Sequence, residues 1–313
     1  MAPQSVLITG CSEGGIGYAL AVEFQKRGLH VFATTRTVAK MAKLENVPNI
    51  TLLSLDVTSS DSIAAAVEAV KLKTGGTLGC LVNNSGSQYV MPVLDLDINK
   101  AKEMYEVNVW GVVAVTQAFA PLVISAKGSI VNMASIAGCM YPPFMGESSK
   151  ILPFSPLGNI TLTVVRNVTG LYSASKSALA TVSEALRLEM KPFGVKVVTV
   201  ITGSVESNIF VNAPEHHLPP GSLYGSAEKA IANRATGKDV NQHSTREDFA
   251  HSLVSDILGG ASGKVYRGKM STTARLVLTY MPTFIIVSWL FHPPIYFLPF
   301  SFRFVRDMFS ISF

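Results

Sequence analysis

Short apolar runs alternate along this chain with segments whose apolar residues recur at helical spacing. Most of the runs are continuously apolar, which is typical of strands buried on both faces of a parallel sheet. Segments such as 16–28 and 59–73 fit as helices between the runs. The alternation predicts an α/β fold built on a doubly wound, Rossmann-type parallel sheet. The predicted strands are 5–10, 30–35, 51–56, 78–84, 128–135 and 196–203, with a last short strand at 263–268.

The composition argues against several classes of protein. Of the 313 residues 48% are hydrophobic, and the net charge of +5 includes no long Lys/Arg run, so no nucleic-acid partner is expected. The N-terminus lacks the basic and apolar regions of a secretory signal. Three cysteines at unrelated spacings favour small buried side chains in a reducing compartment over disulfides or a metal site. The pair His216-His217 beside Glu215 has no further ligand cluster, so no metal is predicted.

A glycine-rich turn, "TGCSEGGIG" at 9–17, joins the first predicted strand to the first predicted helix. Backbone N–H groups and the positive end of the helix dipole bind phosphate at such a turn. Glycine is needed where a Cβ would block the approach of the backbone to a pyrophosphate. This context favours a dinucleotide site over a plain tight turn. The predicted cofactor-binding residues of the turn are Thr9, Gly10, Ser12, Gly15, Ile16 and Gly17.

The end of the second predicted strand indicates which dinucleotide would bind. An NAD site places an acid there to accept from the ribose 2′-hydroxyl, whereas this chain has "TTR" ending at Arg36. Arg36 would pair with a 2′-phosphate, which favours NADP(H). The alternative is that Arg36 is only a solvated loop residue. The cofactor contacts predicted at the ends of later strands are Asp56, Val57, Asn83, Thr202 and Gly203.

Several motifs occur in a definite order along the chain. They are Thr9-Gly10 with Gly15-Ile16-Gly17, Asp56, Asn83-Asn84-Ser85-Gly86, Asn108 in "YEVNVWG", Ser135 in "VNMASIAG", and Tyr172 with Lys176 in "YSASK". Together they resemble the short-chain dehydrogenase/reductase family over roughly 5–203. The resemblance implies an NADP-dependent oxidoreductase that acts on CH–OH or C=O groups and assembles as a homo-oligomer. Two departures exist: the glycine turn is one residue longer than usual in the family, and "TG" at 202–203 stands where Pro-Gly is usual.

The resemblance implies a catalytic set of Ser135, Tyr172, Lys176 and Asn108. Ketone reduction needs a hydride, which the cofactor supplies, and a proton for the oxygen. Tyr172 and Lys176 are four positions apart and share a helix face, where the ammonium and an oxidised nicotinamide would lower the phenol pKa. Both residues are also predicted to contact the cofactor. Ser135 would hold the carbonyl oxygen, and Asn108 would hold a water that links Lys176 to solvent. The alternative for the Tyr172–Lys176 pair alone is an ordinary amphipathic helix face.

The segment 147–170 separates Ser135 from Tyr172 more widely than is usual in the family. The separation is 37 positions, and removal of 147–170 would return it to 13. Codons for 146–148 can contain a 5′ splice signal and codons for 169–170 a 3′ splice boundary, so we hypothesise a retained intron or an error in gene assignment. The alternative is a genuine insertion in the substrate loop, because the closure of a longer loop costs little free energy. The sequons at Asn159 and Asn167 are interpreted as chance matches.

From Leu276 to Phe302 the chain carries no formally charged residue. This stretch is long enough to span a bilayer, but its prolines argue against a straight spanning helix. We therefore expect 271–313 to form a hairpin or an interfacial helix, with Trp289 near lipid headgroups and the basic residues before it facing anionic lipid. The alternative is a tail that packs over the substrate cleft or at a dimer interface.

The apolar tail, the basic charge and the motifs "TGCSEGGIG" and "ATTR" are similar to the NADPH-dependent 1-acyldihydroxyacetone-phosphate reductase branch of the family. That resemblance implies reduction of a lipid-like ketone to 1-acylglycerol 3-phosphate, with a reductase domain at 1–270. It also implies a position at the endoplasmic reticulum membrane or on lipid droplets, with the catalytic domain facing the cytosol. The alternatives are a steroid, retinoid or 3-ketoacyl oxidoreductase, and an inactive lipid-surface protein whose active site the insertion disrupts.

Overall fold

A computed structural model describes residues 5–139, 170–211, 217–239 and 243–280. The chain divides into two compact units, Met1–Thr272 and Thr273–Phe313. The first unit contains the whole sheet and every predicted catalytic and cofactor residue. Within the second unit, the described part is the end of helix α9 (Ser271–Tyr280). Most of the predicted insertion, both sequons, His216 and the tail beyond Tyr280 lie outside the described residues.

The first unit is built on a seven-stranded parallel sheet in the order β3-β2-β1-β4-β5-β6-β7. This confirms the doubly wound fold, because the chain winds outward from β1 in one direction and then from β4 in the other. Every strand end lies within two residues of its predicted position. The strands are β1 (Ser5–Thr9), β2 (His30–Thr35), β3 (Ile50–Ser54), β4 (Cys80–Asn83), β5 (Ser129–Ser135), β6 (Lys196–Thr202) and β7 (Gly263–Arg267).

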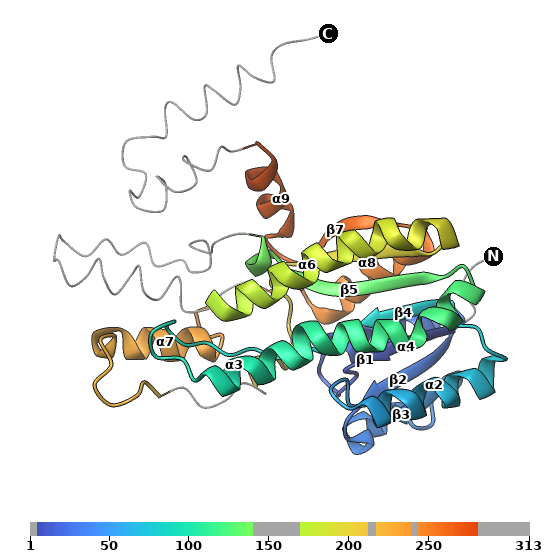
Figure 1. Cartoon of the computed structure of the whole chain (residues 1–313), viewed down its shortest axis with the longest axis horizontal. Coiled ribbons are helices and arrows are strands. Elements are labelled where there is room, and N and C mark those ends of the chain that lie inside the picture. The colour runs from blue at the N-terminus through green and yellow to red at the C-terminus, as the bar shows by residue number, and fades with distance from the viewer. Residues whose placement is uncertain (1–4, 140–169, 212–216, 240–242, 281–313) are drawn as a thin grey trace, which may run out of the picture. The chain divides into compact units, whose positions relative to one another are not determined.

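Helices cover both faces of the sheet. On one face, α1 and α8 pack against each other and against β1, β2 and β6 through a core that includes Phe24 and Phe249. On the other face, side chains of α2, α4 and α6 pack around Phe32 and Phe119. Figure 1 shows α4 and α6 crossing the near face of the sheet. The bounds are α1 (Ile16–Lys26), α2 (Ser60–Thr74), α3 (Ile98–Tyr105), α4 (Gly111–Ser125), α6 (Gly170–Met190), α7 (Glu228–Ala235) and α8 (Arg246–Leu258).

Local sequence explains where several helices begin and end. Ser59 caps α2 by accepting a hydrogen bond from the backbone N–H of Ser62, and the helix ends at Gly75 in a left-handed conformation with φ 68°. Thr245 caps α8, and its hydroxyl also contacts the Asp248 carboxylate at 2.6 Å. The Thr245 hydroxyl thus satisfies one of the free N–H groups at the start of α8.

A π-helical turn, Glu106–Trp110, connects α3 to α4 and carries the buried Asn108. Such turns are rare and are frequent at functional sites. Among the described residues, the stretch Ile98–Ser125 that contains this turn is the one helical segment long and apolar enough to cross a membrane. Half of its most apolar window is buried, and Val115 and Phe119 lie in the core, so it packs as an internal helix of the first unit.

Candidate active site

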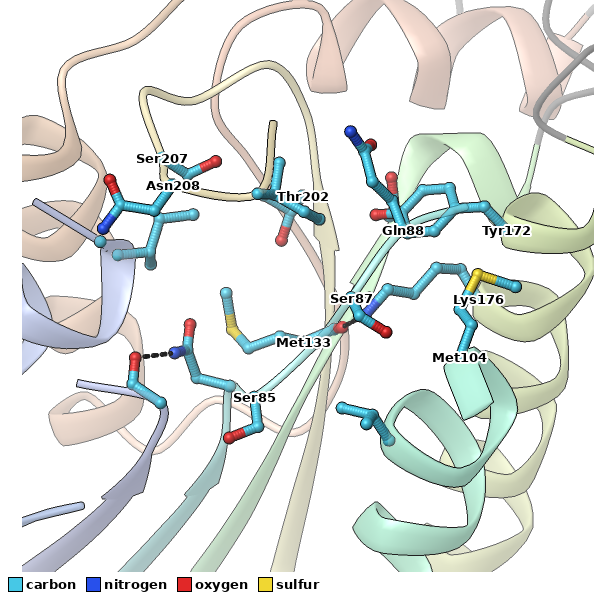
Figure 2. Close-up of a pocket in the computed structure, with 18 of the residues that line it drawn as sticks. Ser85, Ser87, Gln88, Met104, Met133, Tyr172, Lys176, Thr202, Ser207 and Asn208 are labelled. Atoms are coloured by element: carbon cyan, nitrogen blue, oxygen red, sulfur yellow. Dashed lines mark hydrogen bonds between the residues drawn. The ribbon is translucent and has the colours of Figure 1, made fainter. Parts of the chain in front are cut away.

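A cavity of about 550 Å³ lies at the carboxyl ends of the parallel strands. It spans the point between β1 and β4 where the winding direction reverses, which is where open α/β sheets bind their ligands. Figure 2 shows Tyr172 and Lys176 reaching from α6 toward Ser87 and Met133. Predicted site residues from both halves of the sequence therefore line one cavity. They are Gly10, Ser12, Gly15, Ile16, Arg36, Asp56, Val57, Ser135, Tyr172, Lys176, Thr202 and Gly203.

The glycine-rich turn fits a phosphate group. Gly10 and Gly14 have φ values of 76° and 80°, which a side chain would make strained. Helix α1 begins after Gly15, which has no side chain to cap the first N–H groups of the helix. These groups remain available for an anion at the positive end of the helix dipole. The residue types and backbone present therefore fit the pyrophosphate of a dinucleotide.

Gly17 has a packing role in the glycine-rich turn, which is one residue longer than is usual in the family. A Cβ on Gly17 would lie 2.5 Å from the Gly10 carbonyl oxygen and 2.6 Å from the Asn84 amide nitrogen. Gly17 therefore permits the close packing of α1 on the turn, and it does not itself line the cavity. Gly203 lines the cavity and also permits a close approach of two backbone segments, since a Cβ there would lie 2.0 Å from the Lys269 carbonyl oxygen. The "TG" that replaces Pro-Gly keeps the glycine that this approach requires.

Besides Gly17, two further predicted cofactor residues, Thr9 and Asn83, do not line the cavity. The Thr9 hydroxyl accepts hydrogen bonds from the backbone N–H groups of Asn84 and Ser85, both at 2.9 Å, and so fixes the turn after β4. The Asn83 amide is buried and donates to Thr116 and Asn132 at 3.0 and 2.8 Å. The prediction for Asn83 therefore needs correction, because strand alternation directs its side chain into the core while the residues after it, 84–89, line the cavity.

The loop after β6 and the first residue of α8 contact the glycine turn from outside. Asn208 donates to the Glu13 carbonyl oxygen at 2.7 Å, and the Arg246 guanidinium donates to the Gly14 carbonyl oxygen. Ser207 and Asn208 also line the cavity, as Figure 2 shows. These residues were missed in the sequence, because they follow the last recognisable motif and share no spacing with it.

At the other end of the cavity, Arg36 follows β2 as an exposed residue. The hydroxyls of Ser12 and Thr35 lie 3.3 Å apart beside it in the cavity wall. The pKa of Asp56 is lowered although burial raises it, because the Thr58 backbone and hydroxyl donate to the carboxylate and the Arg36 charge acts on it. Arg36 and the nearby hydroxyls thus lie where an NAD site would place an acid to accept from the ribose 2′-hydroxyl.

Ser135 and Tyr172 form the centre of the site. The Ser135 hydroxyl and the Tyr172 phenol both line the cavity, where Ser135 acts to lower the phenol pKa, and the Ser135 oxygen accepts from the Ala137 N–H at 3.1 Å. The direction of the Ser135 hydroxyl is thereby fixed by the 3₁₀ turn that follows β5. Burial raises the phenol pKa, against the lowering influence of the Ser135 hydrogen bond and of the Arg234 charge. The expectation that Lys176 lowers the phenol pKa is therefore wrong for the protein groups alone: burial dominates and raises this pKa, and the Lys176 amine lies 6.0 Å from the ring centroid.

Lys176 and Asn108 lie on the inner side of this pair. The Lys176 amine is buried and donates to the Met133 carbonyl oxygen at 2.8 Å, and burial lowers its pKa to about 8. Asn108 accepts from the Ser87 N–H and donates to the Ser87 carbonyl oxygen, both at 2.9 Å. Space for a Cβ on Gly86 is limited by Asn108 Oδ1 at 3.4 Å and Lys176 Nζ at 3.5 Å. Both polar groups therefore converge on Gly86 at the cavity wall.

The remaining titratable groups give no metal site in the described part of the chain. Cys11 and Cys80 are buried free thiols whose pKa values burial raises to about 12, as expected of small apolar side chains. Cys139 is partly buried, and burial raises its pKa as well.

Fold and site together define a nicotinamide-dependent oxidoreductase in which a serine and a tyrosine line one cavity with a dinucleotide turn. Comparison with protein families agrees: the short chain dehydrogenase family matches residues 4–148 and 161–217. This chain therefore belongs to the short-chain dehydrogenase/reductase family. The interruption of the match, 149–160, falls within the segment 147–170 that the Ser–Tyr spacing singles out.

Related proteins include several fungal members of this family. Short-chain dehydrogenase PC-15 of Penicillium crustosum is 43% identical over 285 residues, covering 91% of this chain and 96% of its own length. The NADPH-dependent 1-acyldihydroxyacetone phosphate reductase of Schizosaccharomyces pombe is 36% identical over 262 residues, covering 82% and 79%. A short-chain dehydrogenase from Burkholderia cenocepacia, solved in complex with NADP, has the same fold with a TM-score of 0.66. It is 22% identical and covers 93% of this chain and 99% of that one.

Proposed function

We propose that this protein reduces the ketone of a lipid to an alcohol with NADPH, and that 1-acyldihydroxyacetone phosphate, which yields 1-acylglycerol 3-phosphate, is the leading substrate. The observation that carries the proposal is the single cavity in which Ser135, Tyr172 and Lys176 face the glycine-rich turn. The relationship to the reductase of Schizosaccharomyces pombe supports the substrate class.

The choice of NADPH rests on the residues after β2. Arg36 lies at the cavity, and no acid follows β2 to accept from a ribose 2′-hydroxyl. A guanidinium binds a 2′-phosphate through charge-assisted hydrogen bonds. The NADP complex of the Burkholderia cenocepacia protein and the NADPH dependence of the Schizosaccharomyces pombe reductase support the same cofactor.

A bound reduced nicotinamide supplies a hydride, so the chain itself must deliver a proton to the carbonyl oxygen. Tyr172 is the acid, because its phenol lines the same cavity as the Ser135 hydroxyl. Ser135 orients the carbonyl oxygen beside that phenol. The raised phenol pKa keeps Tyr172 protonated at neutral pH, so the proton is present before the substrate arrives.

Lys176 and Asn108 act after the phenol has given up its proton: they stabilise the phenolate and let a proton return from solvent. The ammonium of Lys176 stabilises a phenolate on the same helix face. Its pKa of about 8 lets the amine exchange a proton near neutral pH. Asn108 is fixed to the Ser87 backbone by two hydrogen bonds, which gives it a set position for a water between Lys176 and solvent.

An apolar ketone fits the remaining walls of the cavity. Besides the polar catalytic groups, the lining contains large apolar side chains from α3, the π-helical turn, the loop after β4 and the loop after β6. Such side chains remove an acyl or polycyclic substrate from water. The apolar lining supports lipid-like substrates in general, and steroids or retinoids remain the alternative substrates. The apolar residues are Tyr89, Met104, Val107, Ile209 and Phe210.

The inactive alternative is opposed by a specific observation. If 147–170 had displaced the catalytic helix, Tyr172 would not reach β5, yet α6 packs on β5 and Tyr172 lines the same cavity as Ser135 at the end of that strand. Helix α6 begins at Gly170, the last residue of the predicted insertion. The described residues thus keep the arrangement on which catalysis would depend.

The proposed activity is tested by the oxidation of NADPH with 1-palmitoyldihydroxyacetone phosphate. We expect turnover that depends on this substrate and a weaker rate with NADH. The steroid and retinoid alternatives are measured in the same assay with neutral polycyclic and isoprenoid ketones. Reduction of these ketones alone would contradict the proposed substrate, and no reduction of any ketone would support the inactive alternative.

We also propose that 271–313 holds the protein at the endoplasmic reticulum or on lipid droplets, with the catalytic unit in the cytosol. The support is the uncharged stretch 276–302 and the basic residues that precede it. Fractionation without detergent, with the full chain and with a chain ending at 270, tests this proposal. A full chain that stays wholly in the soluble fraction would rule it out.

A further inference from the structure

We infer that Arg234 forms an anion-binding subsite at the substrate end of the cavity, where it recognises a phosphate or carboxylate carried by the ketone substrate. The inference rests on the proposed function, because it names the group by which the reductase selects its ketone. No sequence motif singles out Arg234, which lies on the short helix α7 beyond the last family motif.

The first observation is a buried cation at the cavity. Arg234 lines the cavity and has only 8% of its surface exposed. A guanidinium stays protonated in proteins and carries five N–H donors. A charge removed from water in this way requires an anion or several acceptors.

The second observation is that the protein partner of Arg234 leaves donors unused. Among the described residues, its one side-chain hydrogen bond goes to Asp239, from a single nitrogen at the long distance of 3.3 Å. The other Asp239 oxygen is buried with no partner in the described part of the chain, and burial raises the pKa of that carboxyl. A bidentate, short guanidinium–carboxylate pair is not formed. Asp239 therefore positions Arg234 without saturating it.

The third observation places this cation near the reacting group. Arg234 and Tyr172 line the same cavity, and the Arg234 charge is one of the influences that oppose the raising of the phenol pKa by burial. Gln88, whose side chain lies beside Tyr172 in Figure 2, donates to the carbonyl oxygen of Ala235 at 3.1 Å and ties α7 to the loop after β4. An anion on Arg234 would thus sit at the substrate end of the cavity, whereas Arg36 serves the adenosine end.

Other charges near the cavity do not replace Arg234. Lys100 and Glu103 on α3 also line it, but both are exposed and carry opposite charges. Lys176 is buried, yet its amine is directed to the Met133 carbonyl oxygen. A substrate with a phosphate close to its ketone fits these positions, and so does a 3-keto acid with a carboxylate.

The test compares substrates that differ only in the anionic group. The pairs are 1-palmitoyldihydroxyacetone phosphate against 1-palmitoyldihydroxyacetone, and 3-ketopalmitate against its methyl ester. For Arg234→Gln we expect kcat/KM for the phosphate substrate to fall about 10²-fold, as for loss of charge-assisted hydrogen bonds, with the neutral ketone changed less than about 3-fold. The pair that shows the larger loss identifies the anion. Equal losses for anionic and neutral substrates would overturn the inference.

Asp239→Asn separates an anion receptor from a structural ion pair. A receptor keeps or increases its preference for the anionic substrate when the competing carboxylate is neutralised, whereas a structural pair loses activity equally in both variants. If Arg234→Gln fails to fold, the double variant Arg234→Gln/Asp239→Asn leaves no lone buried charge and carries the same expectation. Arg27→Gln is the matched control, because it removes a guanidinium paired with Glu23 on α1, away from the cavity.

Binding distinguishes failure of this inference from failure of the proposed function. Calorimetric titration of the NADP-loaded protein with 1-palmitoylglycerol 3-phosphate and with 1-palmitoylglycerol requires no turnover. We expect Arg234→Gln to weaken only the phosphate ligand and to leave the Kd of NADPH unchanged. Weakened NADPH binding would mean that Arg234 serves the cofactor instead. Equal affinity of wild type and variant for the phosphate ligand would overturn the subsite even if the enzyme reduces the ketone.

Discussion

The Ser135 hydroxyl and the Tyr172 phenol line the same cavity and Ser135 acts on the phenol pKa, although 37 positions separate the two residues in the chain. This arrangement forms because β5 ends at Ser135 and α6, which packs on β5, begins at Gly170. The position of Tyr172 is therefore set by the packing of α6 on the sheet, where Leu179 and Ala180 are buried. This explains how a long connection can join two groups that must lie in one site.

Replacement of Tyr172 by phenylalanine should remove the proton donor and keep the fold. We expect kcat for ketone reduction to fall by about 10²–10⁴-fold, the range for loss of a general acid, with little change in the Kd of NADPH. Stopped-flow NADPH oxidation and fluorescence titration measure the two quantities. Tyr18→Phe, on α1 and outside the cavity lining, is the control and should keep full activity. Full turnover in Tyr172→Phe would mean that another group supplies the proton.

Ketone reduction should weaken at alkaline pH because of Lys176. Burial lowers the pKa of Lys176 to about 8 from a model-peptide value of 10.5, so the ammonium is lost as the pH rises through 8. The phenol of Tyr172 has a raised pKa and stays protonated over that range. We expect kcat/KM to decline above about pH 8, and Lys176→Arg, whose cation does not titrate, to move this decline upward. A profile that is the same in wild type and Lys176→Arg would assign the ionisation to another group.

The sequence predicted the sheet more completely than the walls of the cavity. Continuous apolar runs define buried strands, and a glycine turn between strand and helix defines the phosphate end, so Gly10 and Arg36 were placed correctly at the cavity. Asn83 was misplaced because the motif at 83–86 does not show which of its side chains points into the core and which toward the cavity. Asn208 and Arg234 were missed because they lie beyond Gly203, where no local sequence pattern marks them. Only the tertiary fold brings them to the cavity.

Arg36 should determine the choice of cofactor. Arg36→Asp removes the group that would meet a 2′-phosphate and adds an acid where a ribose hydroxyl would donate. We expect kcat/KM with NADPH to fall about 10–10²-fold and the rate with NADH to rise, as for loss of one charge-assisted contact. Lys40→Gln is the matched control, since Lys40 is a nearby exposed cation outside the cavity lining. An equal loss in both variants would point to general surface potential and not to a specific phosphate contact.

Gly17→Ala should disturb the packing of α1 on the glycine turn. The new Cβ would meet the Gly10 carbonyl oxygen at 2.5 Å, so the helix or the turn must shift. We expect a loss of about 1–3 kcal/mol in the free energy of unfolding, as for overpacking, together with weaker NADPH binding. Gly225→Ala is the control, because a Cβ there meets nothing within 4 Å and φ is not positive. Denaturant unfolding compares the two variants, and equal stability would contradict the packing role of Gly17.

Deletion of 147–170 should leave a functional enzyme, since among the described residues β5 positions Ser135 and α6, which packs on β5, positions Tyr172. The deleted chain has a Ser–Tyr separation of 13 positions. We expect its kcat with the phosphate ketone to equal or exceed that of the full chain, because a misplacement of about 1 Å at the catalytic helix can cost 10²-fold in rate. Sequencing of the transcript addresses its origin: a retained intron predicts that most messages lack these codons. A deleted chain that folds but is inactive, with the codons present in most messages, would instead establish 147–170 as a genuine part of the substrate loop.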